Sequence, residues 1–238
     1  MTALPVHTAV VSGASRGIGL EITRALIGGG VHVAMLARSA GELELRAAEL
    51  GSLAIPMPCD VAEPGAVRHV AQQIFNRFGG PPSTIVNNAA RFTLQTVERT
   101  EPPDFRATID VNLVAPFLLV NAFLGDMRVR NSGHIVTIGS IADRVAFPEN
   151  GAYAASKFGL RAFHEVLRGE LRGSGIRVTL ISPGPVDTSM WDEVDPDNRP
   201  GFAPRRQMLV PAAVARAVLF ALSESNDVNV DELRLSHT

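Results

Sequence analysis

The sequence predicts an α/β fold in which seven parallel strands form one sheet with helices on both of its faces. Short, nearly continuous apolar runs rich in Val and Ile alternate along the chain with longer amphipathic stretches. Runs that are apolar throughout are typical of strands covered on both sides. Strand–helix alternation in turn predicts parallel strands joined by right-handed crossovers. The 238 residues contain no repeat and no Pro/Ser-rich linker, so we expect a single domain over 1–238.

Each element follows from its local pattern. Strands are predicted at the seven apolar runs Thr8–Val11, Val31–Leu36, Leu53–Met57, Thr84–Val86, His134–Ile138, Arg177–Ile181 and Val228–Leu233. Helices are predicted at the amphipathic stretches Ile18–Gly28, Glu42–Leu50, Ala66–Phe78, Pro103–Met127, Ala152–Arg172 and Pro211–Ser223. One long, proline-containing segment lies outside this alternation, and because loops of that length are often active-site lids we predict a substrate lid at 183–209.

Composition and charge exclude several classes of protein. Apolar residues make up 46% of the chain and charged residues 19%, which excludes a disordered chain, and the net charge of −2 gives no electrostatic footprint for nucleic acid. The single Cys excludes an internal disulfide and a multi-Cys zinc site. Residues 1–5 carry no positive region of a secretory signal, and the longest apolar run, 111–124, is shorter than the roughly 20 residues of a membrane span. We therefore expect a cytoplasmic protein that binds neither nucleic acid nor membranes.

A glycine-containing turn, Ser12-Gly13-Ala14-Ser15-Arg16-Gly17-Ile18-Gly19, follows the first predicted strand directly. In a doubly wound, Rossmann-type sheet, ligands bind at this position, outside the carboxyl ends of the strands. We expect Gly13 to form the tight turn, Gly17 to let the backbone approach a pyrophosphate, and Gly19 to let the helix pack closely. The N-terminus of the following helix would then face the phosphates. A strand–helix turn without a ligand is the alternative. The spacing also differs from the common dinucleotide-binding pattern, because three residues rather than one separate the first two glycines.

The end of the second predicted strand distinguishes between the two nicotinamide nucleotides. NAD-binding proteins of this architecture usually place an acidic residue there for the ribose hydroxyls, whereas this sequence has Ala37-Arg38-Ser39. Arg38 can pair with a 2′-phosphate, and Arg16 can supply a second guanidinium. We therefore predict NADP(H) in preference to NAD(H), with two solvated surface arginines as the alternative.

The chain contains one Tyr and one Lys, and these lie four residues apart at Tyr153 and Lys157. On a helix this spacing places both side chains on one face. An ammonium about 4 Å away, at an effective dielectric near 20, favours the phenolate by about 4 kcal/mol, which moves a phenol pKa from ~10 to near ~7. Burial acts in the opposite direction. A Tyr that titrates near neutrality can exchange a proton with a carbonyl or an alcohol, and we expect its pKa to be lowered in an NADP complex.

Ser140 ends the fifth predicted strand, on the same edge of the sheet as the glycine turn. There its hydroxyl can donate a hydrogen bond to a substrate oxygen. The alternatives are a Ser that caps the following turn and a Tyr–Lys pair on a solvated helix surface.

Together these motifs resemble the short-chain dehydrogenase/reductase family along almost the whole chain. The glycine turn is similar to the family pattern Thr-Gly-x-x-x-Gly-x-Gly, with Ser12 at the Thr position, and Asn87-Asn88-Ala89-Ala90 resembles its Asn-Asn-Ala-Gly motif. Ser140, Tyr153 and Lys157 match the catalytic Ser, Tyr and Lys in order and spacing. Further matches are Asn112 in the fourth helix, Asp60-Val61 after the third strand, and Pro183-Gly184 followed by Val186 and Thr188.

The resemblance implies an enzyme, carbonyl reductase-like or 3-oxoacyl reductase-like, that interconverts a carbonyl and a secondary alcohol by direct hydride transfer without a metal. It implies that Tyr153 is the general acid/base, that Lys157 lowers its pKa and holds the nicotinamide ribose, and that Ser140 orients the carbonyl. Asn112 would keep a kink that holds a water of the proton relay. The implied cofactor contacts are Gly13, Ser15, Arg16, Gly17, Ile18, Gly19, Arg38, Asp60, Val61, Asn88, Ala89, Tyr153, Lys157, Pro183, Gly184, Val186 and Thr188.

Two positions depart from the family pattern. Ala90 replaces a glycine and adds a methyl group near the expected ribose. Asp143 lies three residues after Ser140, where many relatives have Gly. We expect Asp143 either to turn its loop toward solvent or to bias the choice of substrate.

The substrate and the partners are less closely specified. Nine residues flank the motifs or lie in the predicted lid, and several of them are apolar, which predicts a hydrophobic or acyl substrate: Phe92, Ile141, Arg144, Val145, Phe147, Asn150, Met190, Trp191 and Phe202. The alternative is that Trp191 and Phe202 only pack the lid down. Four arginines form either a patch near the mouth for an acyl carrier or, more simply, exposed helix-end cations: Arg128, Arg130, Arg168 and Arg172. Excess apolar surface on the fourth and fifth helices predicts a homodimer or homotetramer. A non-catalytic NADP-sensing scaffold is the second hypothesis, although a sensor needs no Ser, Tyr, Lys and Asn set.

Overall fold

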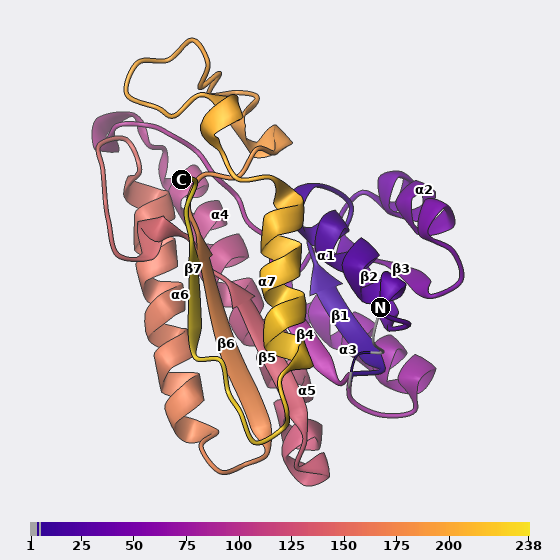
Figure 1. Ribbon diagram of the computed structural model, residues 1–238. Helices are drawn as coiled ribbons and strands as arrows, with labels where there is room; N and C mark the ends of the chain where they lie inside the picture. The colour runs from indigo at the N-terminus through magenta and orange to yellow at the C-terminus, as the bar shows by residue number, and fades with distance from the viewer. Residues whose placement is uncertain (1–3, 5) are drawn as a thin grey trace.

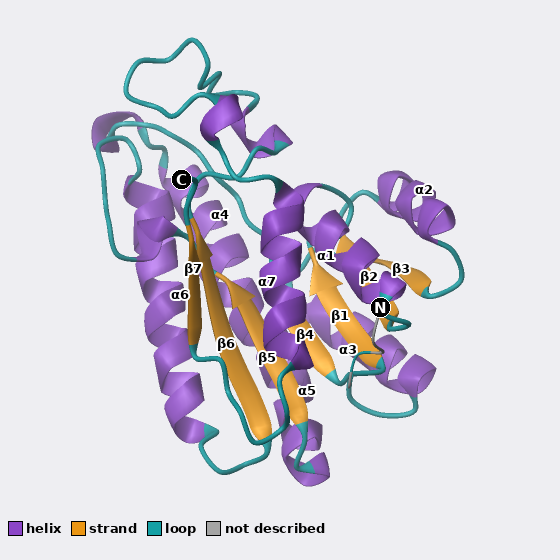
Figure 2. Ribbon diagram, in the orientation of Figure 1, coloured by secondary structure: helices purple, strands orange, loops and turns teal. Residues whose placement is uncertain are grey.

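In the computed structural model, which describes residue 4 and residues 6–238, a seven-stranded sheet lies between two layers of helices (Figures 1 and 2). The strand order is β3-β2-β1-β4-β5-β6-β7, and all neighbouring strands are parallel. The predicted doubly wound α/β sheet is therefore confirmed. The expectation about a secretory signal falls on residues 1–5, which lie outside the described residues except for Leu4.

Six strands and all helices begin and end close to the predicted positions. The strands are β1 Thr8–Ser12, β2 His32–Ala37, β3 Ala54–Pro58, β4 Thr84–Asn87, β5 Gly133–Ile138, β6 Ile176–Pro183 and β7 Glu232–Leu235. The helices are α1 Gly17–Gly28, α2 Ala40–Leu50, α3 Pro64–Phe78, α4 Pro102–Ile109, α5 Ala115–Arg130, α6 Gly151–Glu170 and α7 Pro211–Ser223.

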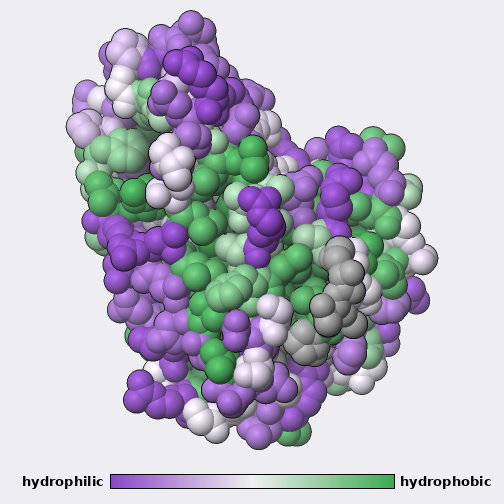
Figure 3. All heavy atoms as spheres, viewed as in Figure 1, coloured by the Kyte–Doolittle hydropathy of each residue, from purple (hydrophilic) through white to green (hydrophobic). Residues whose placement is uncertain are grey.

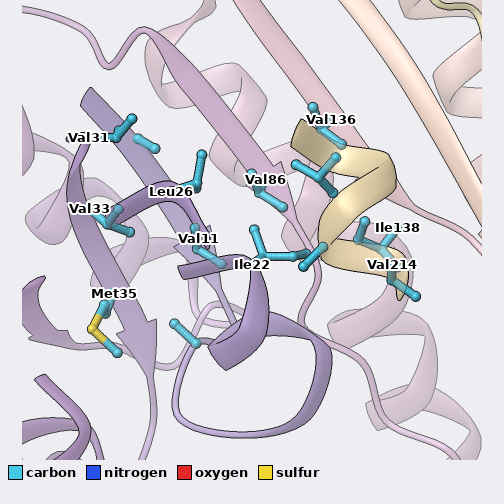
Figure 4. Close-up of a cluster of buried hydrophobic side chains, with 14 of the residues drawn as sticks. Val11, Ile22, Leu26, Val31, Val33, Met35, Val86, Val136, Ile138 and Val214 are labelled. Atoms are coloured by element: carbon cyan, nitrogen blue, oxygen red, sulfur yellow. The ribbon is translucent and has the colours of Figure 1, made fainter. Parts of the chain in front are cut away.

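The core is divided by the sheet into two halves, because successive side chains of a strand point to opposite faces. In β1, Val11 packs with α1, α2 and α7 on one face, while its neighbour Val10 packs with α3, α5 and α6 on the other. Figure 4 shows the first half, where Ile22 of α1 and Val214 of α7 meet the strand side chains. Burial of these apolar faces fixes the register of every strand, and with it the level at which each strand ends.

Because the strands are parallel, their carboxyl ends share one edge of the sheet. The chain proceeds outward from β1 to β2 and β3, and then returns to place β4 on the other side of β1. In such sheets the point where the order reverses is the usual place for a ligand. The segment 184–210, between β6 and α7, lies above this edge (Figure 1).

The last strand begins later than predicted. The sequence predicts Val228–Leu233, whereas β7 covers Glu232–Leu235. Before it, the Asn229 side chain occupies the place of a strand backbone: its Oδ1 accepts from the Val178 N–H at 2.8 Å and its Nδ2 donates to the Val178 carbonyl at 3.0 Å. A side-chain amide has the same donor and acceptor pair as a peptide group, so it satisfies the edge of β6 without a strand.

The predicted helix Pro103–Met127 consists of α4, a π-helical turn at Asp110–Val114 and α5. Such turns insert one extra residue into a helix and often mark functional sites. By length and composition, the combined segment Pro102–Arg130 is also apolar enough to cross a membrane. In this fold Leu119, Phe123 and Met127 of that segment are buried in the core beneath the sheet.

Two buried histidines are expected to make the fold sensitive to acid. Burial lowers the pKa of His134 to about 3 and that of His164 to about 4, and the charges of Arg177 and Arg168 act in the same direction. An unfolded His titrates near ~6.5, so between about pH 6.5 and 4 the unfolded chain binds protons that the folded chain does not. Stability therefore falls as the pH drops through this window.

The His164→Leu variant, which removes one of these groups, is expected to lose part of that dependence. Its free energy of unfolding in urea should fall by about 2 kcal/mol less than that of the wild type between pH 7 and pH 5. The exposed His69→Leu variant controls for the loss of a histidine. Equal slopes for His164→Leu and wild type would contradict the assignment.

Candidate functional site

The glycine turn between β1 and α1 has the backbone that only glycine adopts readily. Gly13 and Gly17 have positive φ values of 67° and 55°. A Cβ atom on Gly19 would lie 2.1 Å from the Gly13 carbonyl oxygen and 2.5 Å from the Asn88 side chain. At Gly17 a Cβ would come within 3.3 Å of Thr188, so the turn and the segment after β6 lie side by side. The free N-terminus of α1 and this uncovered backbone form a cradle suited to a pyrophosphate.

Ser12 ties the glycine turn to the end of β4. Its Oγ accepts from the backbone N–H groups of Asn88 and Ala89, both at 3.0 Å. The Asn88 side chain returns the contact by donating to the carbonyls of Ser12 at 2.8 Å and Gly13 at 3.3 Å. The Asn88 side chain thus holds the glycine turn against the end of β4. Ser12 holds the same two segments together, although the sequence analysis noted it only as a substitute for Thr.

The remaining predicted cofactor residues lie along the same edge. Arg16 and Arg38 are exposed beside the turn and at the end of β2, and neither pairs with a carboxylate among the described residues. Ser15 donates to Glu42 at 3.3 Å, so one acidic group also faces this corner. After β3, Val61 is buried and Asp60 accepts from the Ala62 N–H at 3.1 Å.

Tyr153 and Lys157 lie on the first two turns of α6, and both are nearly fully buried. The Lys157 Nζ lies 5.6 Å from the centre of the Tyr153 ring and donates to the Ile138 carbonyl at 3.0 Å. The predicted helix thus brings both groups to the end of β5. Ile138 is the last residue of that strand, two residues before Ser140.

Burial dominates the titration of both groups. It raises the pKa of Tyr153 to about 12; a hydrogen bond with Ser140 acts in the lowering direction, and the charge of Asp143 adds to the rise. Burial also lowers the pKa of Lys157 to about 8, against the opposing charge of Asp143. The estimate from sequence, in which the ammonium nearly sufficed to bring the phenol to neutrality, is therefore wrong for the protein alone, because desolvation penalises the phenolate and the charge of Asp143 acts in the same direction. The lowered pKa expected in an NADP complex stays a prediction.

Ser140 caps the following turn, as the alternative interpretation expected, while its hydrogen bond to a substrate oxygen stays a prediction. Its Oγ accepts from the Ala142 N–H at 3.1 Å, which caps the turn at Ile141–Asp143, and its hydrogen bond to Tyr153 lowers the pKa of that phenol. Asp143, at the end of this turn, is only 1% exposed. The expectation that Asp143 turns the loop toward solvent is therefore wrong, and the residue points into the protein.

Asn112 lies in the π-helical turn and is fully buried. Its Oδ1 accepts from the Arg91 N–H at 2.7 Å, and its Nδ2 donates to the Arg91 carbonyl and to Ser156 Oγ, both at 2.9 Å. Ser156 in turn donates to the Tyr153 carbonyl at 2.7 Å. Asn112 is thereby connected to the turn of α6 that carries Tyr153 through Ser156, a residue that sequence reasoning missed although it lies between Tyr153 and Lys157.

An aromatic row leads from Tyr153 into the segment above the sheet edge. Successive edge-to-face pairs join Tyr153 to Phe92 at 4.9 Å, Phe92 to Trp191 at 5.1 Å, and Trp191 to Phe202 at 6.1 Å between ring centres. Phe147 extends the row from Phe202 at 6.4 Å. These residues therefore pack the segment down onto Tyr153, as one of the two sequence interpretations held.

The other substrate candidates differ in exposure. Ile141, Val145 and Met190 are exposed, Asn150 is buried, and Arg144 pairs with Asp143.

The four arginines considered for an acyl carrier lie far from this edge. Arg128 and Arg130 end α5 just before β5 begins, and Arg168 and Arg172 lie at and beyond the end of α6 just before β6 begins. The helices run antiparallel to the strands, so these positions are at the amino ends of the strands, low in Figure 1. The idea of a basic patch near the mouth of the site is therefore wrong.

The chain was also compared with known proteins. Residues 7–199 match the family model described as short chain dehydrogenase. An uncharacterised oxidoreductase of Staphylococcus saprophyticus is 32% identical over 228 residues, which cover 94% of this chain and 92% of the relative. A dehydrogenase/reductase SDR family member 7B of Bos taurus is 34% identical over 76% of this chain and 58% of its own length.

Two solved structures share the fold over nearly the whole chain. A metagenomic short-chain oxidoreductase in complex with NADP superposes with a TM-score of 0.84 at 29% identity, covering 98% of this chain and 97% of that one. An alcohol dehydrogenase from the archaeon Thermococcus sibiricus, complexed with 5-hydroxy-NADP, gives a TM-score of 0.86 at 30% identity with the same coverage.

Proposed function

Because the chain belongs to the short-chain dehydrogenase/reductase family, we propose that it is an NADP(H)-dependent enzyme that interconverts a carbonyl and a secondary alcohol. Membership of this family supports a dehydrogenase or reductase activity. The observation that carries the finer proposal is the meeting of Ser140, Tyr153 and Lys157 at the sheet edge that also holds the glycine turn.

The proposed chemistry assigns one task to each side chain. The bound nicotinamide would supply or accept the hydride, with its pyrophosphate in the cradle of Gly13, Gly17 and Gly19. Tyr153 would carry the proton that the carbonyl oxygen gains, and Ser140 would hold that oxygen by a hydrogen bond. Since burial raises the pKa of Tyr153 to about 12, the phenol is protonated at neutral pH and suited to act as a proton donor. We therefore propose that the protein without nucleotide holds Tyr153 in the protonated form that carbonyl reduction requires.

A substrate panel tests this proposal. Oxidation of NADPH and NADH is followed side by side with ketones, oxoacyl thioesters and quinones. We expect turnover of at least one class, with higher kcat/KM for NADPH. A protein that binds NADPH but oxidises it with no member of the panel would instead support the nucleotide-sensing scaffold.

The preference for NADP(H) is proposed to depend on Arg38, with Arg16 as the second cation; the NADP in two similar structures supports it. Hydrogen bonds to charged groups contribute about 1.5–3 kcal/mol, so Arg38→Ala should raise the KM for NADPH by roughly 10- to 100-fold. The KM for NADH should change little. Arg24→Ala, on the exposed side of α1, is the control. Equal effects of Arg38→Ala on both nucleotides would contradict the assignment.

The substrate is proposed to be apolar near its carbonyl group. The aromatic row from Phe92 to Phe202 borders Tyr153, and aromatic edges favour contact with apolar or aromatic surfaces. When small oxo acids are added to the panel, aryl ketones should therefore exceed them in kcat/KM. The reverse ranking would contradict an apolar site. The predicted lid, 183–209, is proposed as the segment that must move to admit these substrates.

A homodimer or homotetramer is also proposed. Large apolar side chains are exposed along α4, α5 and α6, the helices through which the family pairs its subunits: Phe105 and Phe117, and Phe158 and Val166. A second apolar area lies across the front of the molecule around α7 (Figure 3), where Phe220 is exposed. Light scattering at micromolar concentration should give a dimer or tetramer mass, and a monomer would contradict the proposal.

A cytoplasmic location without membrane or nucleic-acid partners is proposed as well. The fold shared with short-chain oxidoreductases supports it. Recovery of the protein in the membrane fraction of lysed cells would contradict it.

A further inference from the structure

Asp143 is a carboxylate inside the protein, at the sheet edge that holds Ser140. Its Oδ2 accepts from Ser182 Oγ at 2.5 Å, and its Oδ1 accepts from the Arg144 Nε at 2.7 Å. A Cβ on Gly139 would lie 2.9 Å from Oδ2, so the carboxylate lies directly against the peptide that follows β5. It therefore bridges the ends of β5 and β6, beside Ser140 on one strand and Pro183 on the other.

The charges around Asp143 come from three elements. Its neighbour Arg144 is shared, because the other end of that guanidinium pairs with Glu232 of β7, which also lies 3.9 Å from Arg234. Lys157 and the neutral Tyr153 face the cluster from α6. The guanidinium of Arg144 lies between the carboxylates of Asp143 and Glu232, so these three groups together carry one negative charge. Among the described residues, the exposed Arg234 pairs only with Glu232.

Lys157 is the cation placed to balance that charge. Its ammonium donates to the Ile138 carbonyl at 3.0 Å, and the Asp143 carboxylate lies against Gly139, the next residue. The two charged groups thus lie against adjacent residues at the end of β5, and both side chains are at most 2% exposed. At such low exposure an opposite charge has a large effect on whether an ammonium keeps its proton.

We propose that Asp143 is a positioning residue of this centre, the buried counter-charge that keeps Lys157 an ammonium and holds it at the Ile138 carbonyl. That this group of residues is a catalytic centre rests on the function proposed above. The interaction between the charges of Asp143 and Lys157 does not depend on that function. Asp143, at the position where many relatives have glycine, then contributes to the function of the site.

The test uses the fact that Lys157 is the only lysine in the chain. Protein labelled with carbon-13 at the lysine ε position gives one lysine signal, whose pH titration belongs to Lys157. We expect a wild-type midpoint near the pKa of about 8 that burial produces. Asp143→Asn, which keeps the size and can still bond Ser182, should lower the midpoint by about one pH unit. Asp126→Asn, exposed on α5, is the matched control and should leave it unchanged.

The outcomes are decisive in either direction. A folded Asp143→Asn protein whose Lys157 midpoint equals that of the wild type overturns the inference. If that variant does not fold, Asp143→Gly, the residue of many relatives, replaces it and is judged by the same shift. A purely structural role would lower thermal stability without moving the midpoint.

The titration needs no turnover, so it is independent of the proposed function. An inert protein with a shifted Lys157 would contradict the function and support the coupling. In an active protein the pH profile of alcohol oxidation should also move to lower pH in Asp143→Asn, because the removed charge opposes loss of a proton from both Tyr153 and Lys157.

Discussion

Tyr153→Phe is expected to lower kcat by about 10²- to 10⁴-fold, the usual contribution of a positioned general acid or base. Phenylalanine keeps the ring that packs against Phe92 at 4.9 Å and lies 5.6 Å from the Lys157 ammonium. The loss therefore isolates the hydroxyl, which is the group proposed to exchange the proton and which has a hydrogen bond with Ser140.

The measurement compares kcat for the best substrate of the panel with the Kd for NADPH obtained by fluorescence titration. The Kd and the unfolding midpoint should remain close to those of the wild type, because the ring and its contacts are retained. Activity within tenfold of the wild type in a folded Tyr153→Phe protein would rule out the proposed proton donor.

Gly19→Ala is expected to abolish measurable NADPH binding. The added methyl would lie 2.1 Å from the Gly13 carbonyl oxygen and 2.5 Å from the Asn88 side chain. One of these neighbours is backbone in the turn itself, so α1 and the turn must separate. Overpacking of this kind costs about 1–3 kcal/mol, and it also disrupts the N–H groups that would face the pyrophosphate.

Gly41→Ala is the matched control for this prediction. Gly41 lies in α2 with no atom within 4 Å of the added methyl. Alanine has the higher helix propensity, so this variant should be as stable as the wild type or slightly more so, with unchanged NADPH affinity. If Gly19→Ala bound NADPH like Gly41→Ala, the cradle would not be the nucleotide site.

Much of the fold could be predicted from the sequence because the sheet is buried on both faces. A strand covered on both faces has to be apolar almost throughout, as Val31–Leu36 is. Such a run can be recognised without knowing which strands and helices pack against it. The prediction of the last strand was wrong at its start, because Val228 lies outside β7. The side chain of Asn229 instead completes the edge of β6, and a single side-chain amide gives no periodic pattern in the sequence.

The residues of the candidate site could be predicted from the sequence, but the protonation states of their side chains could not. Tyr153 and Lys157 were found by their spacing, which fixes one helix face. Their protonation depends on how much of each side chain is buried and on Asp143, which reaches them through folding. The direction in which Asp143 points is likewise set by Ser182 and Arg144, one of them far along the chain.

The aromatic row has a consequence for how the site can open. Trp191, the only tryptophan in the chain, rests on Phe92, and Phe92 rests on Tyr153. Its indole N–H also donates to the Val186 carbonyl at 3.1 Å, within the same segment. Uncovering Tyr153 by a movement of the segment 184–210 therefore separates the indole from its aromatic neighbour. The protein thus carries a natural fluorophore at the boundary of the proposed lid, and a lid movement that admits a substrate would change the surroundings of that one indole.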